Sequence, residues 1–159
     1  MRGICNHTYG KRALGNVVLW AVLGLLTVSC GKRDTGSREV GRYRFSAKLM
    51  ESAEKRQRLS LSLEMVNGQD FVASHSNGQD DKQRFLHYLS YAFEKDLYLE
   101  AGKEKFPCVF LHFERSFDLS PARRFSLGFS GKNLRGRTAK LVIDSDRFGT
   151  GPVKIPLDL

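Results

Sequence analysis

The feature that most constrains the fold of this chain is an alternation of apolar and polar residues with a period of two. Successive side chains of a β-strand point to opposite faces of a sheet, so this alternation is typical of a strand with one buried face. Six segments show the pattern, and they cover residues 43–49, 59–65, 109–113, 125–129, 141–143 and 153–159. The chain is therefore expected to fold mainly into antiparallel β-structure.

Turn signals separate the alternating segments. Asn67-Gly68 and Asn77-Gly78 are both Asn-Gly pairs, which are favoured where the two central residues of a hairpin turn need a positive φ. These two turns bound a short segment, residues 70–74, which we interpret as a strand.

Residues 82–100 have a mixed pattern. Phe85 and Leu89 fall on one face of a helix that Asp80 or Asp81 would cap, which is the usual arrangement at a helix start. The aromatic content of the same segment favours a strand instead. The segment is therefore open to both interpretations.

The neighbouring short strands favour β-structure at residues 86–93 and 97–100, with at most one short helix between residues 82 and 100. Residues 43–159 are thus expected to form a single, mainly all-β domain. Its seven to nine short strands predict an antiparallel β-sandwich of immunoglobulin-like architecture.

The first 29 residues indicate a signal peptide. Their charged residues are all basic, namely Arg2, Lys11 and Arg12. A mostly apolar run follows at residues 17–28. Twelve residues match the hydrophobic region of a signal peptide and fall short of the roughly 20 that a membrane-spanning helix needs.

The apolar run ends in Leu26-Thr27-Val28-Ser29-Cys30, which resembles the lipobox of a bacterial lipoprotein precursor. The resemblance covers residues 1–30 and leaves the rest of the chain unmatched. It implies cleavage before Cys30 and attachment of fatty acyl chains such as palmitate to that cysteine. Thr27 departs from the family, which usually has leucine there. The alternative is a plain secretory signal or an uncleaved anchor, with Cys30 an ordinary thiol.

The resemblance also implies a place in the bacterial cell envelope. Acyl chains on Cys30 would hold the protein on a membrane, because each buried methylene contributes about 0.8 kcal/mol. Gly31 follows the cysteine, where an aspartate would resemble an inner-membrane retention signal. The outer membrane is therefore favoured over the inner one.

Residues 30–42 are polar and basic and predict a flexible tether. Removing the three basic residues of the signal peptide from the total of 26 leaves 23 basic against 17 acidic residues, a net charge of +6. A basic domain suits an anionic surface or an acidic partner.

The densest group of reactive side chains lies on one predicted strand. Cys108, Phe110, His112 and Glu114 would share one face of it. A cysteine, a histidine and a carboxylate together suit a nucleophile with its base, or part of a zinc site. Positions four apart on a strand are about 13 Å apart, however, which is beyond hydrogen-bond reach.

A metal site would also need a third ligand, and His75 and His87 have no ligand-like spacing. We therefore predict no catalytic, metal or cofactor site. The alternative is a pocket around His112 and Glu114 that serves an envelope ligand-binding or hydrolytic lipoprotein.

A basic stretch near the C-terminus is a candidate surface for partner binding. The signal peptide separates the chain from most nucleic acid, and no aromatic binding motif accompanies the charges, so nucleic acid is not expected. An anionic lipid surface or an acidic protein fits better, and a merely solvated face is the simplest alternative. The candidate residues are Arg123, Arg124, Arg135 and Arg137.

These observations predict a membrane-anchored envelope lipoprotein that acts as a non-catalytic binding or assembly module. Such a module would be an accessory part of a secretion, conjugation or adhesion apparatus, with an envelope protein as partner. No small-molecule substrate is identified.

Overall fold

A computed structural model describes residues 35–53, 56–114, 120–131 and 134–159. Its contacts divide the chain into two units, Met1–Lys32 and Arg33–Leu159, and every described residue belongs to the second. The predicted signal peptide and Cys30 lie outside the described residues. Among the residues that are described, no helix combines the length and apolarity needed to cross a bilayer.

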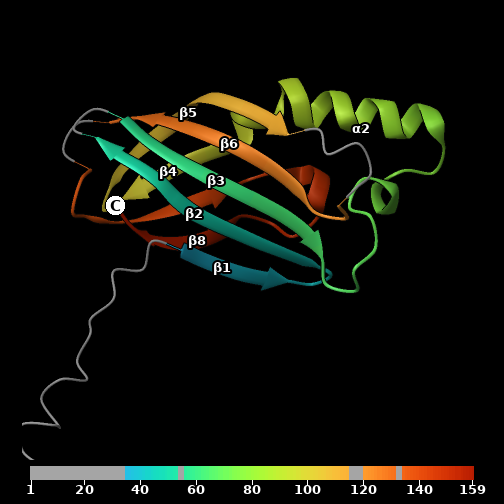
Figure 1. The fold of residues 1–159 in the computed structure, drawn as a ribbon, viewed down its shortest axis with the longest axis horizontal. Helices are drawn as coiled ribbons and strands as arrows, with labels where there is room; N and C mark the ends of the chain where they lie inside the picture. The colour runs from blue at the N-terminus through green and yellow to red at the C-terminus, as the bar shows by residue number, and fades with distance from the viewer. Residues whose placement is uncertain (1–34, 54–55, 115–119, 132–133) are drawn as a thin grey trace, which may run out of the picture. The chain divides into compact units, whose positions relative to one another are not determined.

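Strands dominate the described residues, and one α-helix and three short 3-10 helices accompany them (Figure 1). The strands are β1 (Thr35–Val40), β2 (Tyr43–Ala53), β3 (Arg56–Met65), β4 (Leu97–Ala101), β5 (Glu104–Glu114), β6 (Arg123–Ser130), β7 (Thr138–Ile143) and β8 (Val153–Asp158). The helices are η2 (Ala73–His75), α2 (Gln79–Tyr91), η3 (Phe93–Asp96) and η4 (Asp146–Phe148).

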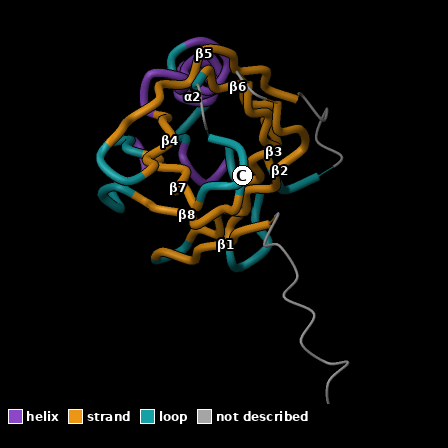
Figure 2. The backbone as a smooth tube through the Cα atoms, turned by 90° about the vertical axis from the view of Figure 1, so that its left-hand side faces the viewer, coloured by secondary structure: helices purple, strands orange, loops and turns teal. Residues whose placement is uncertain are grey.

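The strands form one eight-stranded sheet in the order β1-β2-β3-β6-β5-β4-β7-β8, and every pairing is antiparallel. Figure 2 shows the strands arranged around a ring, with β1 next to β8. The prediction of a mainly antiparallel β domain is therefore confirmed. The nearly closed, barrel-like sheet is not clearly the sandwich that the sequence suggests.

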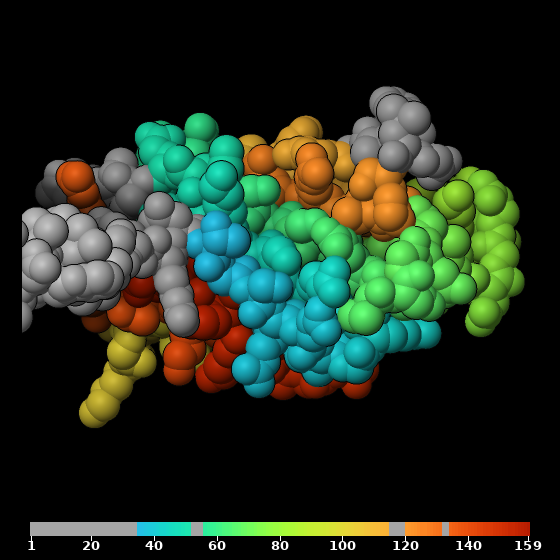
Figure 3. Space-filling view, turned by 60° about the horizontal axis from the view of Figure 1, so that its bottom comes forward, coloured from blue at the N-terminus to red at the C-terminus, as the bar shows by residue number. Residues whose placement is uncertain are grey.

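The two ends of the sheet, β1 and β8, meet at a close contact that we call the seam. A Cβ atom at Gly36 would clash with the carbonyl oxygen of Pro156 and lie 2.7 Å from Cγ2 of Ile155. In an antiparallel strand the N–H and C=O of one residue point to the same side. The carbonyl of Pro156 points toward β1, and because proline has no N–H, this residue has no hydrogen-bond donor on that side. Figure 3 shows β1 in blue beside β8 in red.

Strand β1 also corrects the predicted tether, because it occupies six residues of the segment 30–42. Its ladder with β2 runs from Thr35 opposite Lys48 to Val40 opposite Tyr43. Only Gly36 is fully buried in this strand, so backbone pairing rather than an apolar stripe holds β1 in place.

The predicted alternation matches the core in most strands, but in the predicted segment 109–113 only Phe113 is buried and Val109 is 59% exposed. In β3 every second residue is buried, as are the corresponding residues of β6, β7 and β8. The largest fully buried side chains are phenylalanines and leucines, which fill the space inside the ring and under α2. These phenylalanines are Phe45, Phe71, Phe93, Phe125 and Phe129.

The segment at 86–93 is helical, so the prediction of a strand there was wrong. Phe85, Tyr88 and Leu89 are the buried residues of α2, and their spacing places them on one side of a helix. The residue at the N-cap of the helix is Gly78, which has no side chain to cap it, and not Asp80 or Asp81 as predicted. The prediction of a strand at 97–100 is confirmed by β4.

The predicted strand at 70–74 was also wrong. Asp70 bonds the backbone locally, because its Oδ1 accepts from the N–H of Ala73 at 2.7 Å and its carbonyl accepts from the N–H of Ser74 at 3.0 Å. Such local bonds compete with a sheet ladder. The chain therefore turns into η2 instead of extending.

Candidate functional site

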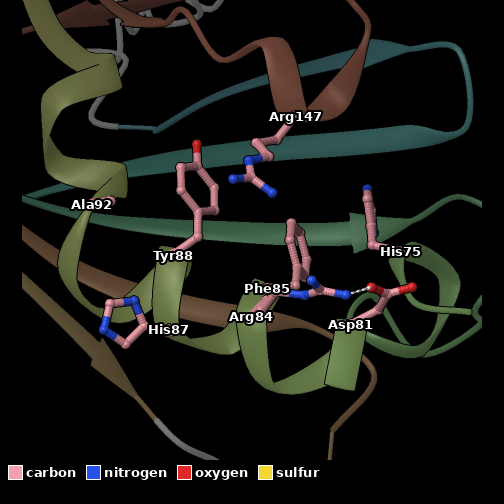
Figure 4. A pocket seen from close by; sticks show the side chains of 8 residues that line it. All are labelled: His75, Asp81, Arg84, Phe85, His87, Tyr88, Ala92 and Arg147. Carbon is pink, nitrogen blue, oxygen red and sulfur yellow. Dashed lines mark hydrogen bonds and ion pairs between the residues drawn. The ribbon is translucent and has the colours of Figure 1, made fainter. Parts of the chain in front are cut away.

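A groove of about 750 Å³ lies between α2, η2 and η4 (Figure 4). Helix α2 and the residue after it supply most of the lining, and η2 and η4 contribute one residue each. We call this the α2 groove. Its lining residues are His75, Asp81, Arg84, Phe85, His87, Tyr88, Ala92 and Arg147.

The first turn of α2 forms one rim of the groove. Asp80 and Asp81 both lie there, where the helix dipole favours negative charge. Asp81 also accepts a bond from Nη2 of Arg84 at 2.6 Å, as Figure 4 shows. The carboxylate of Asp81 is thus already paired within the helix.

His75 is packed between two aromatic rings at the end of the groove. Its ring stacks on Phe85 at 4.6 Å between centroids and on Tyr43 at 5.3 Å. Its Nδ1 lies 2.6 Å from the carbonyl oxygen of Phe71 and its Nε2 lies 2.9 Å from the hydroxyl of Tyr43. Because a carbonyl only accepts, Nδ1 donates; in the neutral ring, Nε2 then accepts from the hydroxyl of Tyr43.

Burial lowers the pKa of His75, although its bond to the carbonyl of Phe71 opposes this effect. The unfolded chain therefore takes up a proton more readily than the folded one. This contribution to stability is complete above the unfolded pKa of about 6.5 and is lost as the pH falls through the lower folded value.

We expect the free energy of unfolding to decrease between pH 7.5 and pH 5.5, and to decrease less in His75→Phe. Phenylalanine keeps the stacked ring but does not titrate. Urea unfolding of both proteins at the two pH values measures the difference, because carboxylates contribute equally to both. Equal pH dependence in the two proteins would contradict the assigned role of His75.

Tyr88 forms the floor of the groove, and its hydroxyl is hydrogen-bonded to residues that do not line the groove. The hydroxyl donates to Oδ2 of Asp96 at 2.5 Å and lies 2.5 Å from Oγ of Ser145, which in turn donates to it. Burial, followed by the bond to Asp96, raises the pKa of Tyr88 far above its usual value. The phenol therefore stays neutral and presents only its ring to the groove.

Arg147 covers that ring. Its Cζ lies 5.1 Å from the centroid of Tyr88, and Figure 4 shows the guanidinium directed into the groove. Among the residues that the structure describes, Arg147 has no ion pair, and only its backbone N–H has a hydrogen bond, to Oγ of Ser145 at 3.3 Å. The side chain therefore offers its donors to a ligand.

The polar atoms of the aromatic side chains His75 and Tyr88 are already bonded within the protein. Both ring nitrogens of His75 and the hydroxyl of Tyr88 are bound within the protein, so neither can serve as a base without breaking those bonds. His87 lies on the exposed rim against Tyr91, with ring centroids 4.9 Å apart. No hydrogen bond joins His87 to any other residue described.

The predicted face of Cys108, His112 and Glu114 does not form. The ladder between β5 and β6 shifts register between Cys108 and Phe110, and this bulge leaves Cys108 half-buried against the core while His112 and Glu114 are exposed. Burial raises the pKa of the Cys108 thiol, which keeps it protonated and poorly reactive. Neither His112 nor Glu114 lines the α2 groove.

Arg123 is not an exposed partner-binding residue. Its side chain is only 6% exposed and is paired with Asp70, and its Nη1 donates to the carbonyl of Ser120 at 2.7 Å. The structure thus assigns it to a buried contact between the segment before α2 and the start of β6.

The other three arginines do not gather on one surface. Arg124 is exposed near the start of β6, opposite Glu114 in the ladder. Arg135 and Arg137 follow the end of that strand, roughly 20 Å farther along it, and Nη1 of Arg137 lies 3.2 Å from Oε2 of Glu104. The basic stretch of the sequence is therefore divided between the two ends of β6.

The residues of the α2 groove escaped sequence reasoning because they come from three separated segments. Nothing near Arg147 marks it as different from other surface arginines. The one signal was the aromatic content of residues 85–93, which indicates an apolar surface in either helix or strand.

Among the described residues, no group of three or more histidine, cysteine, aspartate or glutamate side chains is placed to hold a metal ion. Comparison with known protein families, with characterised proteins and with solved structures gives no significant match.

Proposed function

We propose that this chain is a lipid-anchored protein of the bacterial cell envelope, on the outer membrane rather than the inner one, and that it acts as a non-catalytic binding module. The lipobox-like residues 26–30 and the apolar run before them support the anchor. A module of this kind fits an accessory role in a secretion, conjugation or adhesion apparatus, with an envelope protein as partner.

The observation that carries the binding role is the free guanidinium of Arg147 in the α2 groove. The groove combines that charge with aromatic rings whose polar atoms are already bonded. A few exposed polar groups on an apolar lining are typical of binding sites. The alternative of a reactive pocket around His112 and Glu114 gains no such support.

We also keep the two-layer β-sandwich as a proposal for the architecture. Strand β5 pairs with β4 through residues 104–107 and with β6 through residues 108–114. The sheet can thus be described as two layers that share β5.

A photo-crosslinking residue in place of His87 tests the function in cells that make the full chain. We expect an adduct with an envelope protein from position 87 and none from Lys103, an exposed residue of the β4–β5 turn. Arg147→Glu should lower the yield at least fivefold. Cys30→Ser should abolish fatty acid labelling and also lower the yield, because the anchor raises the local concentration of the domain.

Arg124→Glu is the matched control, since it reverses a charge outside the groove. The proposal fails if positions 87 and 103 give the same adducts, or if Arg147→Glu and Arg124→Glu have equal effects. Unchanged labelling in Cys30→Ser would contradict the lipid anchor.

A further inference from the structure

We infer that the α2 groove binds a carboxylate group carried next to an aromatic or apolar body, as on an acidic peptide segment of the partner. This inference rests on the proposed binding function and names the chemistry of the ligand at the same site. Three observations lead to it: the orientation of Arg147, the charge balance of the lining, and the rings beside it.

Arg147 is held in a fixed position by its neighbours in the chain. Ser145 before it is 3% exposed and Phe148 after it is 5% exposed, so the backbone of η4 is anchored on both sides. The Cζ of the guanidinium then lies over the ring of Tyr88. A guanidinium over a ring keeps N–H groups that can still donate, and its planar fork of donors matches a carboxylate through two parallel bonds.

The charge balance of the lining favours an anion. Its two arginines face one carboxylate, Asp81, which is paired with Arg84 at 2.6 Å. The carboxylate of Asp96 does not line the groove and accepts a hydrogen bond from the hydroxyl of Tyr88. His75 is neutral near pH 7, because burial lowers its pKa. One positive charge, that of Arg147, thus remains for a ligand.

A single unpaired guanidinium balances a single negative charge. A carboxylate meets this condition, whereas a doubly charged phosphate would keep one charge uncompensated unless Arg84 left Asp81. The observations therefore favour the carboxylate.

The rings beside Arg147 supply the apolar part of the site. Phe85 and Tyr88 extend from α2 on the same side as Arg147 (Figure 4), and Ala92 continues this wall. A groove of about 750 Å³ is within the range that holds a small ligand. It accommodates one or two residues of a peptide, with an aromatic or apolar side chain against the rings.

N-acetylphenylalanine is the probe that tests this inference, and its neutral amide is the matched control. Both are titrated into the full chain in nonionic detergent, and NMR follows the Nε–Hε signals of Arg147 and of Arg84, the second arginine of the lining, which Arg147→Gln retains. We expect the acid to shift the signal of Arg147 with a Kd on the order of 1 mM, as its size allows. The amide, and the acid with Arg147→Gln, should bind at least tenfold more weakly. Arg124→Gln should bind the acid as the unchanged protein does.

Equal affinity for acid and amide, or full affinity in Arg147→Gln, overturns the inference. Phenyl phosphate is the third probe, and tighter binding of it than of the acid would assign the site to phosphates instead. If no probe shifts Arg147 while position 87 still crosslinks a partner, the inference fails and the proposed function stands. If the acid binds but no crosslink forms in cells, the proposed function fails and the site chemistry stands.

Discussion

Replacing Phe148 with alanine is expected to lower the free energy of unfolding by about 3–5 kcal/mol. Phe148 is the centre of the aromatic packing at the α2 end of the sheet. Its ring lies within 6.0 Å, centroid to centroid, of five other rings. Those rings are Tyr43, Phe45, Phe71, His75 and Phe93. Alanine would leave a cavity that β2, η2, η3 and η4 all border, and these elements cannot all move to fill it.

Urea unfolding followed by circular dichroism measures this loss. Phe148→Leu is the matched control, and it should lose less than about 2 kcal/mol because leucine keeps most of the buried volume. Alanine and leucine variants of equal stability would show that Phe148 does not organise this end of the domain.

The second large effect is expected at Asp70. Its two carboxylate oxygens accept from different groups: Oδ2 from the buried guanidinium of Arg123, and Oδ1 from the backbone N–H of Ala73. Asp70→Ala removes both acceptors and should cost about 2–4 kcal/mol. The cost falls short of that for a fully buried pair because the side chain of Asp70 is 32% exposed.

Asp70→Asn separates the two contributions. Asparagine keeps an oxygen that can accept from Ala73 but loses the charge opposite Arg123, so its loss should lie between zero and that of the alanine variant. The measurement is the same unfolding experiment at pH 7. A loss below about 0.5 kcal/mol in Asp70→Ala would place this ion pair among the weak ones of the surface.

Most strands could be predicted from the sequence because a strand with one buried face has apolar residues at every second position. Leu59, Leu61 and Leu63 are an example, since each is buried in β3. Strand β1 was not predicted, because it has hardly any apolar residues and so shows no alternation. α2 was assigned to the wrong class because aromatic content was given more weight than the helical spacing of Phe85 and Leu89.

The candidate site was harder to predict than the fold. A β-bulge at residue 109 places Cys108 and His112 on opposite faces of the strand, and no residue type in that segment predicts the bulge. The α2 groove depends on which segments meet in space, since His75 and Arg147 are 72 positions apart in the sequence. The spacing of residues along one strand or helix does not show which distant segments contact each other in the folded protein.

The seam between β1 and β8 has a consequence for the order in which the domain is completed. Gly36 and Pro156, which touch there, stand 120 positions apart. A growing chain can pair β1 with β2 almost at once, whereas the far edge of β1 has no neighbour until β8 has been synthesised. Contacts between such distant residues form late, because a long loop must close first. Until then the edges of β1 and β7 are both open, and open edges invite pairing with other chains. Chaperones that act during synthesis or export would have to cover these two edges in particular.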